Sequence, residues 1–174
     1  EENCVAHNGS LIPIPGRDVM AQAWYQGGIS VFDWSDPENV VEIAFHDRGP
    51  VDSARMTMAG SWSVYWYNGS IVSSEIARGM DVADLTPTQF ISQNEIDAAK
   101  TVKWTHLNAQ GQPLIEWPPS FSLAKAFVDQ LERNKCLSTQ RIGQVRSALA
   151  TAERAPGAQR TSALTTLASQ IQGD

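Results

Sequence analysis

The stretch Asn8-Gly9-Ser10-Leu11 returns in near copy as Asn68-Gly69-Ser70-Ile71. After each copy the chain runs through alternating strand patterns and reaches a Gly-x-x-Val-x-Asp segment, at residues 28–33 and again at residues 79–84. A repeated β-unit cannot bury its apolar faces alone, whereas radial stacking, as in a β-propeller, buries them between neighbouring blades. The repeat therefore predicts two adjacent propeller blades, or parts of two blades.

Short strands separated by turn-forming residues are expected in both units. In the first unit they cover residues 10–14, 19–25, 29–34 and 40–45, which should pair into one four-stranded sheet. In the second unit they cover residues 61–67, 70–74 and 79–85. Asn68-Gly69 is a strong hairpin signal, because both residues tolerate the positive φ angles of a tight turn.

The hydrophobic period changes from that of strands to that of helices near residue 92. Ser92 and Glu95 have capping-box spacing, which predicts a helix through about Lys100. Three later apolar stripes predict helices near residues 121–131, 142–152 and 164–171, which should pack as a small antiparallel bundle. The expected fold is mainly β with an α-helical C-terminal part, divided into residues 1–92, a partial β-propeller of about two blades, and residues 93–174, a helical extension.

Composition restricts the classes of partner. The 174 residues carry a formal charge of -6, and the 13 Lys and Arg residues are scattered, so no nucleic-acid partner is expected. No apolar run approaches the roughly 20 residues that span a bilayer, so no membrane span is expected. The chain starts at Glu1 without an initiator Met or a signal sequence, which favours a processed, truncated or fragmentary chain.

Several motifs, taken together, resemble the C-terminal part of bacterial LVIVD-repeat β-propeller proteins. They are residues 24–33 (WYQGGISVFD), Asp36-Pro37, Asp47-Arg48-Gly49-Pro50, residues 66–69 (WYNG) and residues 74–82 (SEIARGMDV). The resemblance covers roughly residues 3–100, and residues 117–131 resemble the helical tail that some of these proteins carry. It implies an exported protein, extracellular or at the cell surface, whose activity is not established.

The resemblance implies a ring with more blades than this sequence contains. A closed ring needs at least roughly four blades, and this sequence contains about two. The remaining blades are expected either from a missing N-terminal portion or from another chain.

His7 and Glu75 are the candidate metal ligands. Each lies near the start of an equivalent region of its unit, and both could face a central channel and hold a divalent metal. The alternative is a hydrogen-bonded structural histidine, since the sequence has no His-x-x-x-His, Cys-x-x-Cys or dense Asp loop to complete a coordination shell.

Acidic residues and arginines occur together before a glycine in two loops, as Asp47 with Arg48 and as Glu75 with Arg78. These residues could form a polar pocket for an anionic or sugar ligand. The alternative is a pair of surface ion pairs at loop ends, where each contributes little to stability.

Aromatic residues supply the remaining binding candidates. Trp24 and Trp66 are candidates, and so is Asn8, which opens the first repeat. Four rings, those of Trp62, Tyr65, Trp66 and Tyr67, alternate across the two faces of one expected strand. Rings at this density favour stacking on a glycan or a peptide, but packing between blades uses the same residues.

The two cysteines, Cys4 and Cys136, lie in different predicted parts. A disulfide between them would tether the helical tail to the first blade, whereas Cys4 could equally pair with a cysteine in a missing N-terminal portion.

A functional hypothesis follows. The sequence lacks a Gly-x-Ser-x-Gly elbow, a phosphate loop and a Rossmann glycine set. The favoured function is a non-catalytic binding or scaffold module that recognises a protein or glycan. The alternative is a metal-assisted enzyme that acts in the propeller channel through His7 and Glu75.

Overall fold

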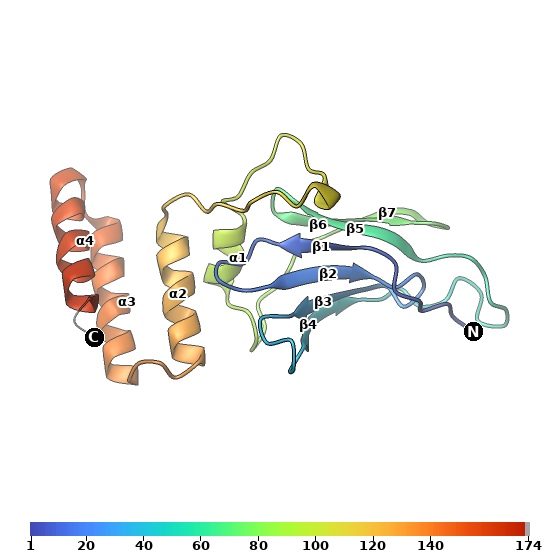
Figure 1. Ribbon diagram of the computed structural model, residues 1–174, viewed down its shortest axis with the longest axis horizontal. Coiled ribbons are helices and arrows are strands. Elements are labelled where there is room, and N and C mark those ends of the chain that lie inside the picture. Colours follow the sequence, from blue (N-terminus) through green and yellow to red (C-terminus); the bar gives the residue numbers. More distant parts are fainter. Residues whose placement is uncertain (173–174) are drawn as a thin grey trace. The chain divides into compact units, whose positions relative to one another are not determined.

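The computed structural model describes residues 1–172 of the chain. It divides into two compact units, Glu1–Pro118 and Pro119–Asp174. Within the described residues the first unit holds two antiparallel sheets, a short α-helix and one turn of 3-10 helix, η1 (Ala109–Gly111), and the second holds three α-helices (Figure 1). The boundary between the two units, after Pro118, lies further along the chain than the change of hydrophobic period near residue 92. The reason is that the first helix belongs to the sheet-containing unit.

The first sheet contains the four strands that were predicted, in chain order. They are β1 (Gly9–Ile12), β2 (Val19–Ala23), β3 (Ile29–Asp33) and β4 (Val41–His46), and each pairs antiparallel with the next. Gly28 makes the turn into β3 with a φ of +79°, and a Cβ added there would lie 2.1 Å from the His46 carbonyl oxygen. Only glycine fits between the two strands at this point.

The second sheet contains β5 (Ser61–Tyr67), β6 (Ser70–Glu75) and β7 (Gly79–Ala83), again antiparallel and in chain order. The predicted Asn68-Gly69 hairpin is confirmed, with φ angles of 51° and 116°. Positive φ at both central residues is the conformation that the twist of a two-residue hairpin requires.

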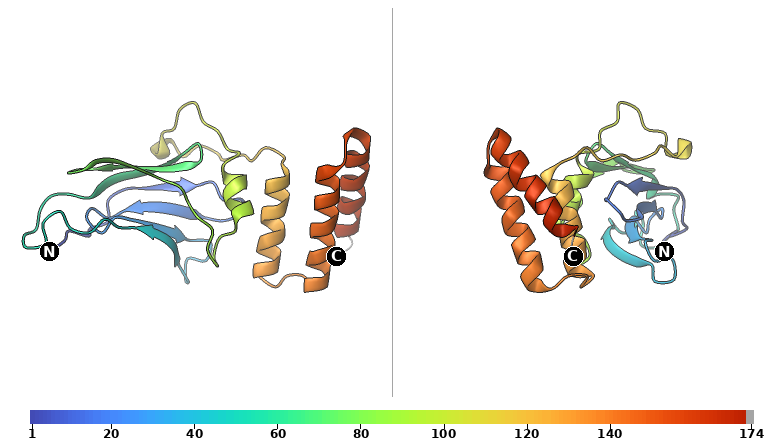
Figure 2. Two further views of the ribbon diagram at one scale, coloured as in Figure 1. Left: turned by 180° about the vertical axis from the view of Figure 1, so that it is seen from behind. Right: turned by 60° about the vertical axis from the view of Figure 1, so that its left-hand side comes forward.

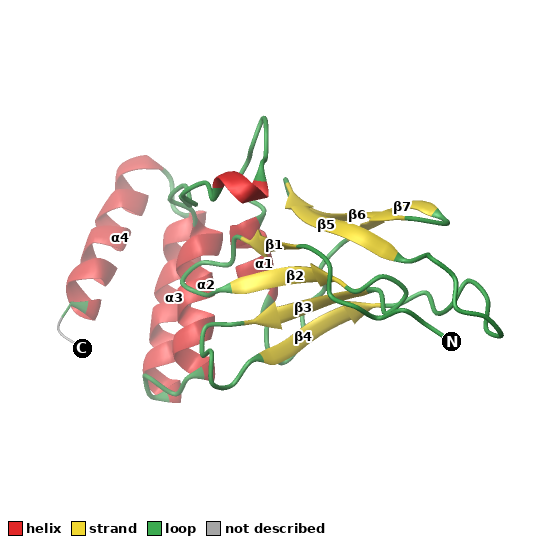
Figure 3. Ribbon diagram, turned by 45° about the vertical axis from the view of Figure 1, so that its right-hand side comes forward, coloured by secondary structure: helices red, strands yellow, loops and turns green. Residues whose placement is uncertain are grey.

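The two sheets share one apolar core. Figure 3 shows β5, β6 and β7 in one layer and β1 to β4 in another, and β5 packs against both β1 and β2. The inward residues of each strand alternate with outward ones, as the pleat requires. The core contains Ile12, Ile14, Val19, Ala21, Ala23, Ile29, Val31, Ile43, Val64, Trp66, Ile71, Leu85, Ile91, Ile96 and Ala99.

Helix α1 (Gln93–Ala99) closes one end of this core. Its predicted capping box is confirmed: Ser92 Oγ accepts from Glu95 N, and Glu95 Oε2 accepts from Ser92 N at 2.7 Å. Arg17, in the β1–β2 turn, donates to Glu95 Oε1 at 2.8 Å and to Asp33 Oδ2 at 2.5 Å. This buried ion network joins the first sheet to the helix.

The three predicted helices of the second unit are confirmed as α2 (Phe121–Arg133), α3 (Thr139–Arg154) and α4 (Gly157–Ile171). They lie side by side in both views of Figure 2, where the colour bar marks them orange to red. Their apolar stripes meet in a second core of Val128, Ile142, Val145, Leu149 and Leu167. None of the described helices is both long and apolar enough to cross a bilayer.

Candidate binding site

A polar cluster forms where the loop after β4 meets the β6–β7 turn. Arg48 Nη1 donates to Asp81 Oδ1 at 2.8 Å, and Arg78 Nη2 donates to the Gly49 carbonyl at 3.1 Å. Asp47 Oδ1 instead accepts from Gly49 N and stabilises its own turn. The structure thus brings the two predicted acid and arginine segments together, with the arginine contacts running between the loops and not within each one.

Glu75 lies beside this cluster and is buried, with 4% of its surface exposed. Its Oε1 accepts from Gly60 N at 2.5 Å, whereas Oε2 has no hydrogen-bond partner within residues 1–172. Gly60 has a φ of +91°, and a Cβ added there would lie 1.9 Å from the carbonyl carbon of Tyr25. The close approach of these two backbone segments fixes the position of the carboxylate.

A small cavity of about 20 Å³ is lined by Glu75, Arg48, Arg78, Asp81, His46 and six further residues of this region, with Gly60 and Ser61 among them. This volume admits one water-sized group. A donor of that size can satisfy the second carboxylate oxygen, since a buried carboxylate oxygen without a partner is costly. The cavity fits a single small donor, and a sugar ring is too large for it.

His7 lies in an aromatic cluster. Its ring stacks on Trp62 with 4.2 Å between centroids and meets the edge of Tyr25 at 5.4 Å. Among the residues that the structure describes, no group of three or more His, Cys, Asp or Glu side chains is arranged to hold a metal ion. The surroundings of the two predicted metal ligands therefore differ. His7 is surrounded by aromatic rings, whereas Glu75 is surrounded by backbone groups and arginines.

Of the other sequence candidates, Asn8 and Trp66 hold the two sheets together. Asn8 Oδ1 accepts from Val64 N at 3.0 Å, and Ser10 Oγ accepts from Trp66 N at 3.3 Å, so side chains of the β1 segment satisfy backbone groups of β5. Trp66 is completely buried in the shared core. Trp24 is half-buried and meets the edge of Phe32 at 6.2 Å.

Cys4 and Cys136 are free and exposed, and they belong to different units. The Cys4–Cys136 disulfide stays a prediction.

An apolar groove of about 570 Å³ was not foreseen from the sequence. The segment after α1 and strand β1 line it with Leu11, Trp104, Leu107, Leu114, Ile115 and Trp117, among others. Trp117 Nε1 donates to the Pro13 carbonyl at 2.7 Å, and Asn68 holds the Trp104 backbone through two hydrogen bonds. The available signal was two tryptophans and several aliphatic residues in a segment otherwise rich in Asn, Gln, Gly and Pro.

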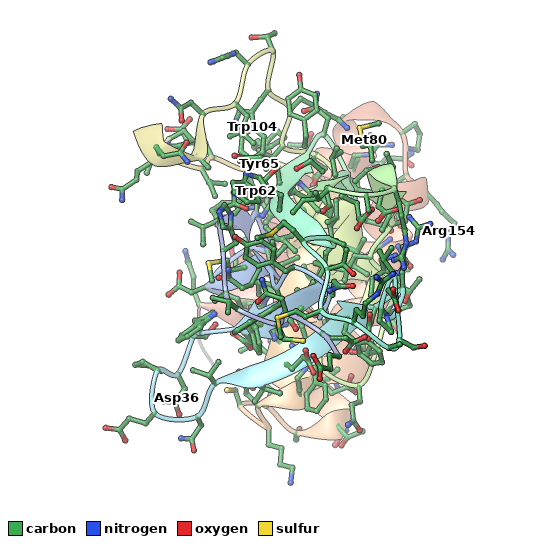
Figure 4. All side chains as sticks on the ribbon, turned by 90° about the vertical axis from the view of Figure 1, so that its right-hand side faces the viewer. Asp36, Trp62, Tyr65, Met80, Trp104 and Arg154 are labelled. Carbon is green, nitrogen blue, oxygen red and sulfur yellow. The ribbon has the colours of Figure 1, made fainter. Side chains whose placement is uncertain are left out.

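The second sheet carries apolar side chains on the face turned away from the core. Tyr65, Val72 and Val82 lie in one row across its three strands, and Met80 lies in the next row opposite Ser74. Val82 keeps 61% of its surface exposed and Met80 keeps 66%; Figure 4 labels Tyr65 and Met80. We call these four residues, with Tyr67, the outer face of the second sheet.

The first sheet shows the same property. Leu11, Met20 and Phe32 form a row across β1, β2 and β3, and Phe45 lies opposite Ser30 on the same side. Leu11 is 53% exposed and Phe45 is 74% exposed. These four residues are the outer face of the first sheet.

Comparison with known proteins finds no matching family model, no matching curated protein and no matching solved structure. The resemblance to LVIVD-repeat propellers therefore stays a prediction from the sequence.

Proposed function

We propose that this chain is a non-catalytic binding or scaffold module that contributes two adjacent blades to a β-propeller. The first strand of each sheet supports this arrangement, because β1 and β5 lie next to each other and are linked through Asn8 and Ser10. The innermost strands of neighbouring blades approach one another in the same way around a propeller axis. The resemblance adds an exported or cell-surface location to the proposal.

The observation that carries the proposal is the apolar character of both faces of both sheets. An antiparallel sheet that borders solvent alternates apolar residues inside with polar residues outside. Here the outer faces present Leu11, Phe45, Met80 and Val82 to solvent. Contiguous exposed apolar residues mark an interaction surface, and a propeller blade is covered by a neighbour on each side.

The metal-assisted enzyme receives less support. The His7 imidazole packs against rings, and one oxygen of Glu75 is engaged by the Gly60 amide. A catalytic metal needs about three protein ligands and an open position. His7 and Glu75 would need a third ligand from outside the described residues to form such a centre.

Two measurements on the purified chain test the proposal. A folded module with exposed apolar faces should enhance the fluorescence of anilinonaphthalene sulfonate at neutral pH, and Val82→Lys should reduce that signal without changing the circular dichroism. Metal analysis after washing with a chelator tests the alternative. Stoichiometric metal that is lost in His7→Ala would favour the enzyme and overturn the scaffold proposal.

A further inference from the structure

A groove runs between the outer face of the second sheet and the segment after α1, which is the yellow loop that follows α1 in Figure 1. Its volume is about 410 Å³, and it is lined by Tyr65, Tyr67, Val72, Thr105, His106 and Leu107. Sites for small ligands commonly have volumes of about 300–1,000 Å³. All six residues belong to the first unit, so one chain supplies both walls of the groove. We call it the tyrosine groove.

The two tyrosines give the groove an aromatic wall. Tyr65 and Tyr67 are two residues apart on β5, so their side chains leave the same side of the sheet, roughly 7 Å apart along the strand. The Tyr67 hydroxyl donates to the Trp104 carbonyl at 3.1 Å, and Asn68 holds the Trp104 backbone through two hydrogen bonds. These bonds fix the position of the Tyr67 ring, while 38% of the surface of this residue stays exposed. A ring that is both fixed and exposed is suited to stacking.

The lining of the groove is uncharged but not wholly apolar. None of the six lining residues is Lys, Arg, Asp or Glu. The hydroxyls of Tyr65 and Thr105 and the neutral imidazole of His106 can each donate and accept a hydrogen bond. A matching ligand is therefore neutral, carries groups that both donate and accept, and has an apolar face for the rings. A sugar has these properties, because hydroxyl groups surround the edge of a pyranose ring and C–H groups cover its faces.

We propose that the tyrosine groove binds a neutral glycan, with a pyranose ring stacked on Tyr67 and its hydroxyl groups bonded to Thr105 and His106. This inference rests on the proposed function, a binding module, and names the class of its ligand. A proline-rich peptide is the alternative, since such peptides also dock on aromatic grooves. Because proline has no N–H, a proline-rich peptide presents mainly acceptors. Groups that both donate and accept match sugar hydroxyls better.

The groove and a neighbouring propeller blade would use different parts of the outer face. The groove takes Tyr65 and Tyr67 on β5 and Val72 on β6, whereas Met80 and Val82 lie on β7 and outside the groove. A neighbouring sheet could therefore pack on the β7 side while the groove stays open. The glycan proposal does not depend on how the propeller is completed.

Isothermal titration calorimetry with neutral hexasaccharides tests the proposal on the whole chain. The probes are cellohexaose, maltohexaose and chitohexaose, and at least one of them should bind. Tyr67→Ala should weaken that binding by about tenfold, because it removes the stacking ring. Tyr67→Phe should weaken it less, because it keeps the ring and loses only the hydroxyl. Trp62→Ala is the control, since Trp62 is an aromatic residue of the same strand and is 45% exposed but lies outside the groove.

Two further probes distinguish the neutral glycan from other ligands. Oligogalacturonate is an acidic glycan, and tighter binding of it than of the three neutral sugars would overturn the neutral class. A polyproline peptide that binds the wild type and not Tyr67→Ala, in a chain that binds none of the sugars, would assign the groove to peptides and overturn the proposal. The same holds if none of the three sugars binds, or if Trp62→Ala weakens sugar binding as much as Tyr67→Ala does.

Failure of the glycan proposal can be separated from failure of the proposed function. A chain that binds none of the sugars, yet enhances the fluorescence of anilinonaphthalene sulfonate and holds no metal, overturns the glycan site and retains the scaffold. Stoichiometric metal that is lost in His7→Ala overturns the proposed function, whatever the sugar titrations show. Circular dichroism and thermal melting of each variant show whether a loss of binding is a loss of folding.

Discussion

Replacing Arg17 by Ala should destabilise the first unit more than any other change of a single charge described above. Arg17 is 10% exposed in its side chain, and its guanidinium donates to Glu95, to Asp33 and to the Phe90 carbonyl. Glu95 is completely buried. The variant keeps the capping box but removes the cation that compensates two carboxylates.

The expected loss follows from burial. Removing one partner of a buried, hydrogen-bonded ion pair costs about 3–5 kcal/mol, because the remaining charge stays in a medium of low dielectric constant. Asp33 is partly exposed and relaxes toward solvent, so Glu95 accounts for most of the loss. For a unit of this size, 1 kcal/mol shifts the melting temperature by about 4 °C, and the total shift is about 12–20 °C.

Thermal and urea unfolding, followed by tryptophan fluorescence, measure the effect. Arg55→Ala is the matched control, because Arg55 also pairs with an aspartate, Asp52, at 3.1 Å but is 84% exposed. An exposed ion pair contributes little, so the control should melt with the wild type. The double variant Arg17→Ala/Glu95→Gln should lose less stability than the sum of its single changes. If Arg17→Ala melted within 2 °C of Arg55→Ala, the reasoning about the buried network would be wrong.

Three further predictions concern the same unit. Burial raises the pKa of Asp33, but hydrogen bonds from Ser35 and Arg17 outweigh it and hold the pKa below its ordinary value of 3.8; Asp33 therefore stabilises the fold above that value, and the contribution is lost as pH falls through the folded pKa. The free energy of unfolding, measured in urea, should fall less steeply between pH 5 and pH 2 in Asp33→Asn than in the wild type. An equal dependence on pH in the two proteins would contradict this. Glu75→Ala should cost about 1–3 kcal/mol in urea unfolding, because it leaves the buried Gly60 amide without its acceptor; Glu75→Gln should restore most of the loss, and equal stability of both variants would refute the role of that hydrogen bond. Gly60→Ala should prevent folding or lower the melting temperature far more than Gly49→Ala, since Gly49 also has positive φ but no atom within 4 Å of an added Cβ; similar melting of the two would show that the clash is relieved.

Local signals in the sequence were sufficient for the elements. Asn68-Gly69 specifies a hairpin, and Ser92 with Glu95 specifies a helix start, because each motif satisfies its backbone groups within a few residues. Helical spacing likewise located α2, α3 and α4. These features depend on neighbours along the chain, which any reader of the sequence can see.

These local signals do not predict contacts between residues that are far apart in the sequence. Arg17 and Glu95 are 78 positions apart, and Arg48 pairs with Asp81 across 33 positions. The sequence suggested ion pairs inside each loop, because it shows proximity along the chain and not across a turn. The groove beside Trp104 and Trp117 was missed for a related reason, since its segment has no periodicity to indicate which side chains face inward.

The same limit explains why the repeat carries more weight than any candidate site residue. A lone histidine or a buried glutamate acquires its role only from the residues that the fold brings near it, and here His7 meets rings and Glu75 meets the Gly60 amide. The repeated strands depend less on such neighbours. The run Val64-Tyr65-Trp66-Tyr67 is apolar on both faces of β5, and the first sheet covers only one of those faces. Part of the remaining face meets the segment after α1, where the Tyr67 hydroxyl donates to the Trp104 carbonyl at 3.1 Å. A further sheet that covers the rest of this face stays a proposal.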